Sequence, residues 1–136
     1  RCSRDWSSDV CSSDLRARYD QWCFFCMMEL DANTLYVIRK HEDLYALYGE
    51  APAALKAARE GFLRQAVAAV ARLKDTAASG PFVLGERFSG ADILFTTCLT
   101  GAIRRNIELP RELHAYLRHT TSRAAYQRAL SANQCP

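Results

Sequence analysis

The cysteines are the first side chains in this sequence whose types and spacing could do chemistry. Cys23 and Cys26 form a C-x-x-C spacing, which in redox proteins places a thiol of low pKa at a helix N-terminus, close behind a strand. Here both cysteines lie in the middle of an apolar, helix-periodic stretch among aromatic residues. We therefore interpret them as small core residues rather than as a redox pair.

The histidines and one serine–aspartate pair are the other candidates for chemistry. His41, His114 and His119 lack a ligand spacing such as H-E-x-x-H, so the sequence predicts no metal site. Ser89 and Asp92 would need a histidine base to act as a catalytic pair, and none is nearby in the sequence. We therefore expect no catalytic residue in this chain.

The stretch "ERFSGADIL", residues 86–94, fits a structural role instead. Ser89 stands at the position of a helix N-cap, and Asp92 is three residues later, as in a capping box with the shorter Asp in place of Glu. Phe88 and Ile93 occupy the two positions of a hydrophobic staple. Because the first N–H groups of a buried helix cannot reach water, the pattern predicts a helix start that is sealed by its own side chains.

The elements that must position these residues are all predicted to be helices. Apolar residues recur with helical period from Arg16 onward, and almost no strand alternation is present. The expected helices cover residues 16–47 (with a kink near 31–33), 52–78, 89–106, a segment opened by Pro110, and a segment that follows Thr121 or Ser122. Residues 89–106 are apolar nearly all round, which predicts an all-α, five-helix bundle with this helix buried at its centre.

Composition excludes several classes of protein. The 136 residues suffice for one domain, and 49% hydrophobic residues allow a real core. The net charge of +3 comes without a basic stripe, so we expect no nucleic acid partner. The apolar runs are too short for a membrane span, and no signal peptide is visible. Six cysteines, three of them in apolar helical runs, fit free thiols and a cytoplasmic location.

Residues 1–15, "RCSRDWSSDVCSSDL", differ from the rest of the chain. They are rich in Ser and Asp, repeat Ser-Ser-Asp and have no usable period, so we expect a disordered head. The segment also resembles a translated sequencing-adapter read, which suggests that it is not native. The sequence therefore predicts a domain at residues 16–136, preceded by a head that does not belong to it.

Three segments, taken in order, resemble the C-terminal domain of bacterial cytosolic glutathione transferases. They are "YDQWCFFCMMEL" (19–30), "FVLGERFSGADILF" (82–95) and "LPRELHAYLRHTTSRAAYQRAL" (109–130). With the helices between them they cover nearly all of residues 16–133. Ala124 departs from the pattern, because many family members have proline after the arginine; this weakens a helix-start signal and little else.

The resemblance implies a function for a larger parent protein. Members of the family join this helical domain to an N-terminal thioredoxin-like domain, which binds glutathione as co-substrate and activates its thiol through Ser, Tyr or Cys. We expect that domain to be missing here and this fragment alone to be inactive. The helical domain is expected to form the wall of the electrophile pocket and to take part in a homodimer. The alternative is a non-catalytic binding or scaffold module with the same fold.

The resemblance also directs attention to the first helix as the pocket wall. One stripe of that helix carries adaptable apolar side chains together with one charged residue, Asp31. It consists of Phe24, Met27, Met28, Asp31 and Leu35. The alternative is that the stripe packs against the N-terminal domain. The opposite stripe, which includes Trp22 and Cys26, is expected to face the core. Arg104 and Arg105 are interpreted as helix C-terminal charges, with anion binding as the alternative.

Overall fold

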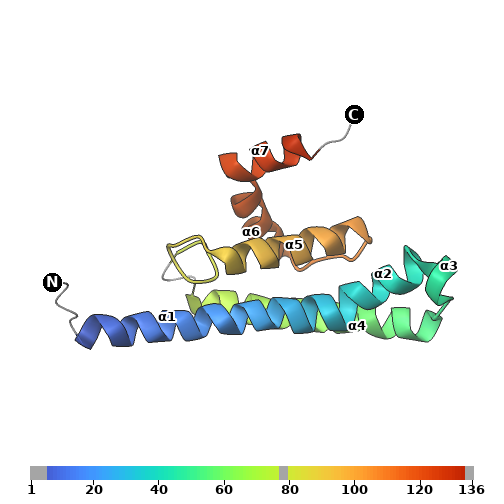
Figure 1. Ribbon diagram of the computed structural model, residues 1–136, viewed down its shortest axis with the longest axis horizontal. Helices are drawn as coiled ribbons and strands as arrows, with labels where there is room; N and C mark the ends of the chain where they lie inside the picture. The colour runs from blue at the N-terminus through green and yellow to red at the C-terminus, as the bar shows by residue number, and fades with distance from the viewer. Residues whose placement is uncertain (1–5, 77–79, 134–136) are drawn as a thin grey trace.

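The chain folds into helices joined by short connections (Figure 1). The computed structural model describes residues 6–76 and 80–133. In chain order the elements are α1 (Trp6–Phe24), η1 (Phe25–Leu35), α2 (Tyr36–Glu42), α3 (Tyr45–Tyr48), α4 (Pro52–Thr76), α5 (Gly90–Arg104), α6 (Arg111–Thr121) and α7 (Ala124–Ala132). Those two ranges contain no strand, only an isolated bridge between Phe82 and Gly85. The prediction of an all-α bundle is confirmed.

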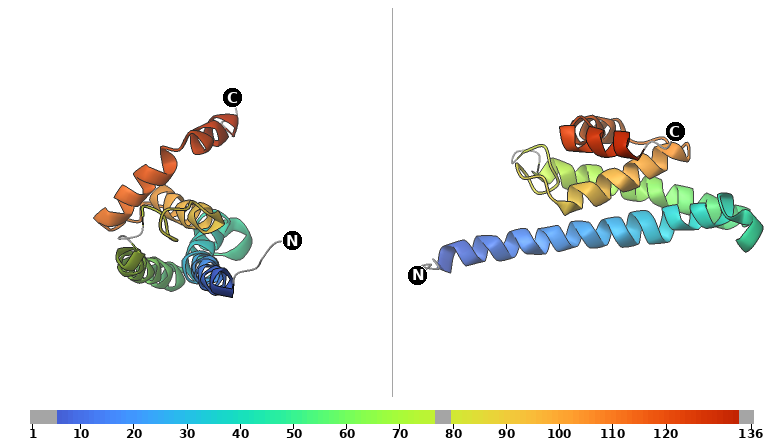
Figure 2. Two further views of the ribbon diagram at one scale, coloured as in Figure 1. Left: turned by 90° about the vertical axis from the view of Figure 1, so that its left-hand side faces the viewer. Right: turned by 45° about the horizontal axis from the view of Figure 1, so that its top comes forward.

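One long rod supports the whole bundle. α1, η1 and α2 follow one another without interruption, and α4 runs back beside them in the opposite direction (Figures 1 and 2). Gly49 lies in the connection that reverses the chain, with a φ of +76° that favours glycine. Pro52 opens α4 at the position where its missing N–H has no helical partner to lose. Small residues such as Ala66 and Ala69 on the buried face of α4 let this helix approach the rod closely.

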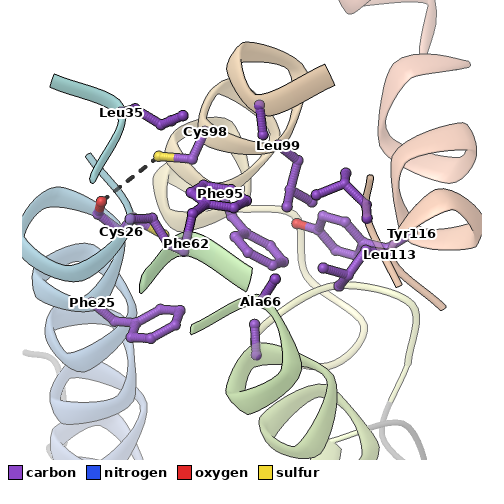
Figure 3. Packing of buried hydrophobic residues seen from close by; sticks show 14 of the residues in the cluster. Phe25, Cys26, Leu35, Phe62, Ala66, Phe95, Cys98, Leu99, Leu113 and Tyr116 are labelled. Carbon is purple, nitrogen blue, oxygen red and sulfur yellow. Dashed lines mark hydrogen bonds between the residues drawn. The ribbon is translucent and has the colours of Figure 1, made fainter. Parts of the chain in front are cut away.

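Helix α5 lies at the centre, as predicted, packed against α1, η1 and α6. The side chains of Phe95, Leu99 and Ala102 are completely buried, and Figure 3 shows the first two in the core beside Phe62 and Tyr116. The expectation that α5 is apolar nearly all round needs one refinement. Its outer face is open to solvent and carries Ile93, Thr97 and Ile103.

The start of α5 has the geometry of a capping box. Asp92 is completely buried and accepts four hydrogen bonds. Its Oδ2 accepts from the N–H and the hydroxyl of Ser89, at 2.8 and 3.0 Å. Its Oδ1 accepts from the N–H of Val83 at 2.9 Å and from the hydroxyl of Tyr116 at 2.8 Å. The carboxylate therefore ties the connection before α5, the helix start and α6 together at one point.

Helix α1 begins at Trp6, so the described part of the expected head, residues 6–15, has helical backbone. That the head is not native stays a prediction. Residues 1–5 lie outside the described ranges. Extending a helix that is already formed adds a hydrogen bond per residue without a new nucleation step, so a Ser- and Asp-rich segment can continue a stable helix. The first turns of α1 project beyond the other helices (Figure 1), and side chains 13–18 are all exposed. The boundary at Arg16 stays a prediction.

The kink expected near residues 31–33 is replaced by a different distortion. Over Phe25–Leu35 the rod is a π-helix, in which each N–H bonds to the carbonyl five residues earlier. Its axis continues that of α1 and α2 (Figure 1). The predicted core stripe is buried as expected at Trp22, Cys26 and Leu30.

Candidate functional site

The last residue of α1 and the π-helical segment η1 position the side chains predicted to line a pocket. At its end the N–H of Tyr36 bonds to the carbonyl of Asp31, a separation of five residues. The hydroxyl of Thr34 adds a bond to the carbonyl of Leu30, which competes with the α-helical pattern. A turn with an extra residue directs the side chains differently from an α-turn, and such distortions are frequent at functional sites.

The five predicted wall residues differ widely in exposure. Phe24, Met27 and Met28 leave 70%, 51% and 52% of their surface open, although all three are large and apolar. Asp31 is half-buried. Leu35 is only 6% exposed and belongs to the core. Three adjacent large apolar side chains held in the open mark this part of the rod as a surface that can receive another apolar group.

The structure divides these five residues between two hollows. Phe24 and Met28 line a groove of about 1,020 Å³ between the end of α1 and α4, which we call the α1–α4 groove. Met27, Asp31 and Leu35 line a cavity of about 430 Å³ between η1, α2 and α5, which we call the α2–α5 cavity. The single stripe predicted from α-helical spacing therefore does not form a single wall.

The α2–α5 cavity also contains residues that the prediction of the pocket wall did not include. Arg39, Arg104 and Arg105 line it. Arg105 forms an ion pair with Asp43 at 2.5 Å and donates to the carbonyl of Gly101 at 3.3 Å. The Arg104–Arg105 pair is visible in the sequence at a helix end. No local signal links it to Arg39, which reaches the same cavity from a segment more than sixty residues away.

Of the two cysteines of the C-x-x-C spacing, Cys26 lies in the core, as predicted, and Cys23 is half-buried and packs against it. Cys26 is completely buried, and the thiol of Cys98 donates to its carbonyl oxygen at 3.7 Å (Figure 3). A hydrogen bond with Cys98 and the burial of the thiol raise the pKa of Cys26 far above its ordinary value. Cys26 therefore stays protonated and is a poor nucleophile, in agreement with the packing interpretation.

The histidines do not form a metal site in the part of the chain that the structure describes, and neither do the other potential ligands there. His41 bonds through Nδ1 to the carbonyl oxygen of Gly49 at 2.9 Å and so holds the chain reversal before α4. His119 lies against the ring of Phe82, with the ring centroids 5.1 Å apart. Both therefore have structural partners.

A comparison with profiles of known protein families identifies the family of this chain. The profile of the family described as "Glutathione S-transferase, C-terminal domain" matches residues 56–130, which is more than half of the chain. The chain belongs to this family. Searches of curated proteins and of solved structures gave no match. The matched range includes the capped start of α5, so the glutathione S-transferase C-terminal domain is here built around the buried carboxylate of Asp92.

The match begins within α4 and does not reach the rod that carries the predicted wall. The family therefore accounts for the capped central helix, whereas the candidate site depends on the geometry of η1 and its two hollows. Within residues 6–76 and 80–133, no helix has both the length and the apolar character that crossing a membrane requires.

Proposed function

We propose that this chain is the electrophile-binding domain of a glutathione transferase, and that Phe24, Met27 and Met28, which line two separate hollows, supply its apolar contacts to the electrophile. Asp31 and Leu35 flank this surface within the α2–α5 cavity. The observation that carries the proposal is the exposure of three large apolar side chains, Phe24 at the end of α1 and Met27 and Met28 on the π-helical segment η1, in a domain of this family. Methionine side chains adapt to ligands of different shape, which suits a pocket for varied electrophiles.

The proposed reaction needs a partner domain for its other half. A thioredoxin-like domain, joined N-terminally in the parent protein, would bind glutathione and lower the pKa of its thiol, because the thiolate is the nucleophile. The thiolate sulfur attacks the electrophilic carbon of an aryl halide, the new S–C bond forms, and halide leaves. The thiol proton passes to solvent. The residues of the present chain hold the electrophile in place and exclude water from its apolar part.

The decisive experiment joins this chain to a thioredoxin-like domain of the same family and measures conjugation of glutathione. The electrophiles are a panel of aryl halides and α,β-unsaturated carbonyl compounds. Met27→Ala combined with Met28→Ala should raise KM for the electrophile several-fold and leave KM for glutathione unchanged, because only electrophile contacts are lost. Leu47→Ala is the matched control, since Leu47 is an exposed apolar residue on α3, away from both hollows.

Two results would count against this function. A hybrid that binds glutathione but conjugates no electrophile of the panel would support a non-catalytic scaffold. A hybrid whose KM values are unaffected by the methionine substitutions would remove η1 from the electrophile pocket. Formation of a homodimer is a separate proposal, and sedimentation of the hybrid tests it.

The cytoplasmic location is likewise a proposal. Cys23, Cys26 and Cys98 carry free thiols, as is usual in a reducing compartment. Localisation of the parent protein in its host cells tests this point directly, and recovery in an oxidising compartment would contradict it.

A further inference from the structure

We propose that the α2–α5 cavity binds a small organic carboxylate, whose charged group is held by Arg39 and Arg104 and whose apolar part lies on Met27, Leu35 and Leu94. All five side chains line the same cavity. Guanidinium groups bind carboxylates through paired N–H donors in a fixed geometry, which makes arginine well suited to this role.

The guanidinium groups of Arg39 and Arg104 keep their donors available. The guanidinium of Arg104 has no hydrogen bond or ion pair to any residue that the structure describes. Arg39 stacks on the ring of Tyr36, with its guanidinium carbon 5.1 Å from the ring centroid. Stacking uses the face of the guanidinium and leaves its N–H edge free. Two arginines that line one cavity with unused donors are a ready receptor for an anion.

Arg105 also lines the α2–α5 cavity, but its role there is structural. Its guanidinium is paired with Asp43, and its backbone carbonyl accepts from Arg59 Nη1 at 2.8 Å. Arg59 in turn pairs with Glu42 at 2.6 Å. This network joins α2, α4 and the end of α5, so Arg105 holds these elements around the cavity while its charge is balanced by Asp43.

The remaining polar groups of the cavity favour a single negative charge. Asp31 is the acidic side chain among the lining residues, against Arg39 and Arg104 and the Arg105 that is paired with Asp43, so the lining keeps an excess of positive charge. The hydroxyls of Thr97 and Thr100 donate to the backbone carbonyls of Ile93 and Thr96 and do not compete for the ligand. The lining thiol of Cys98 donates to the carbonyl of Cys26.

The size of the cavity indicates how large the apolar part of the carboxylate ligand must be. At about 430 Å³ it falls within the range of roughly 300–1,000 Å³ typical of small-molecule sites. An inorganic anion would fill little of this space and would leave the apolar side chains unused. A carboxylate attached to an aromatic or branched aliphatic body satisfies both the charged and the apolar parts of the lining.

This inference deepens the proposed function, because Met27, Asp31 and Leu35 belong to both. As a statement about substrates, namely that the preferred electrophiles carry a carboxylate, it rests on the proposed function. The claim that the cavity binds a carboxylate does not rest on the proposed function, because the 136-residue chain alone can be titrated without glutathione.

The test compares 4-phenylbutyrate with its neutral amide by isothermal titration calorimetry on the 136-residue chain at low ionic strength. The carboxylate should bind about tenfold more tightly than the amide, and added salt should reduce the difference. Arg39→Gln and Arg104→Gln should each weaken carboxylate binding several-fold, whereas Asp31→Asn should strengthen it by removing a repelling charge. Arg128→Gln, at an exposed site on α7, is the matched control and should change nothing.

Equal binding of the acid and the amide, no binding of either, or carboxylate binding that ignores Arg39 and Arg104 would each overturn the inference. Circular dichroism should show that all variants are folded, because Arg39 and Arg104 are exposed and the carboxylate of Asp31 has no partner among the described residues. If the hybrid transferase conjugates neutral and anionic electrophiles equally well, the proposed function stands and the substrate preference fails.

Discussion

At the scale of single residues, the phenol of Tyr116 shows how burial creates a dependence on pH. Its hydroxyl donates to the Asp92 carboxylate at 2.8 Å, and its side chain lies in the core. Burial raises the pKa of Tyr116 well above its ordinary value of 10.0, and the negative charge of Asp92 raises it further. The folded protein therefore holds this proton more tightly than the unfolded chain does.

The raised pKa of Tyr116 predicts a loss of stability at alkaline pH. The stabilising effect is fully present below pH 10 and declines as the pH rises above 10, where the unfolded chain alone releases the proton. Relative to Tyr116→Phe, the wild-type protein should lose about 1.4 kcal/mol of unfolding free energy per pH unit in that range. Urea unfolding of both proteins at pH 8 to 11 measures this.

The same pair of proteins provides its own control. Cys26 and Tyr19 also have raised pKa values, but they are present in both proteins and cancel in the difference. Below pH 9 the two stability curves should run parallel, offset by about 1 kcal/mol for the lost hydrogen bond. Parallel curves up to pH 11 would show that Tyr116 ionises freely in the folded state.

Individual residues differ in how far the sequence could predict their roles. Ser89 and Asp92 could be paired because a capping box is a local pattern with fixed spacing. The hydrogen bonds from Val83 and Tyr116 to the same carboxylate could not be predicted from the sequence. Tyr116 is 24 residues away and reaches Asp92 only after α6 packs on α5.

At the scale of elements, the start of α5 should be the most sensitive point of the bundle. Asp92→Ala removes the acceptor of four hydrogen bonds and leaves buried donors without partners, so it should lower the free energy of unfolding by at least about 2 kcal/mol. Asp31→Ala is the matched control, because that carboxylate has no partner among the described residues. Chemical denaturation of both variants gives the comparison, and equal midpoints would contradict the capping role.

The η1 segment marks where prediction by periodicity fails. Helical periods identify the long helices and their buried faces, because burial repeats with the turn of the backbone. A π-helical stretch changes that repeat through long-range packing and leaves no separate pattern in the apolar residues. For this reason Phe24 and Met28 were predicted on one wall with Met27, Asp31 and Leu35, whereas the structure places the two groups in separate hollows.

At the scale of the whole molecule, the order of helices was accessible from the sequence and the cavities were not. Each helix has its own start signal, apolar stripe and stop signal, and short connections limit how the helices can pack. A cavity depends instead on distant segments that meet. The α2–α5 cavity combines residues 26–39 with residues 94–105, and no spacing within either segment indicates the other.

The extent of the domain can be tested by shortening the chain from its N-terminus. Removing residues 1–15 should change the free energy of unfolding by no more than about 1 kcal/mol, because side chains 13–18 are exposed and the described core begins at Trp22. Far-UV circular dichroism should lose the helical signal of residues 6–15. Removing residues 1–25 is the contrasting variant: it takes Trp22 and Phe25 from the core and should abolish cooperative unfolding. A loss of several kcal/mol in the shorter truncation would place the domain boundary before Arg16.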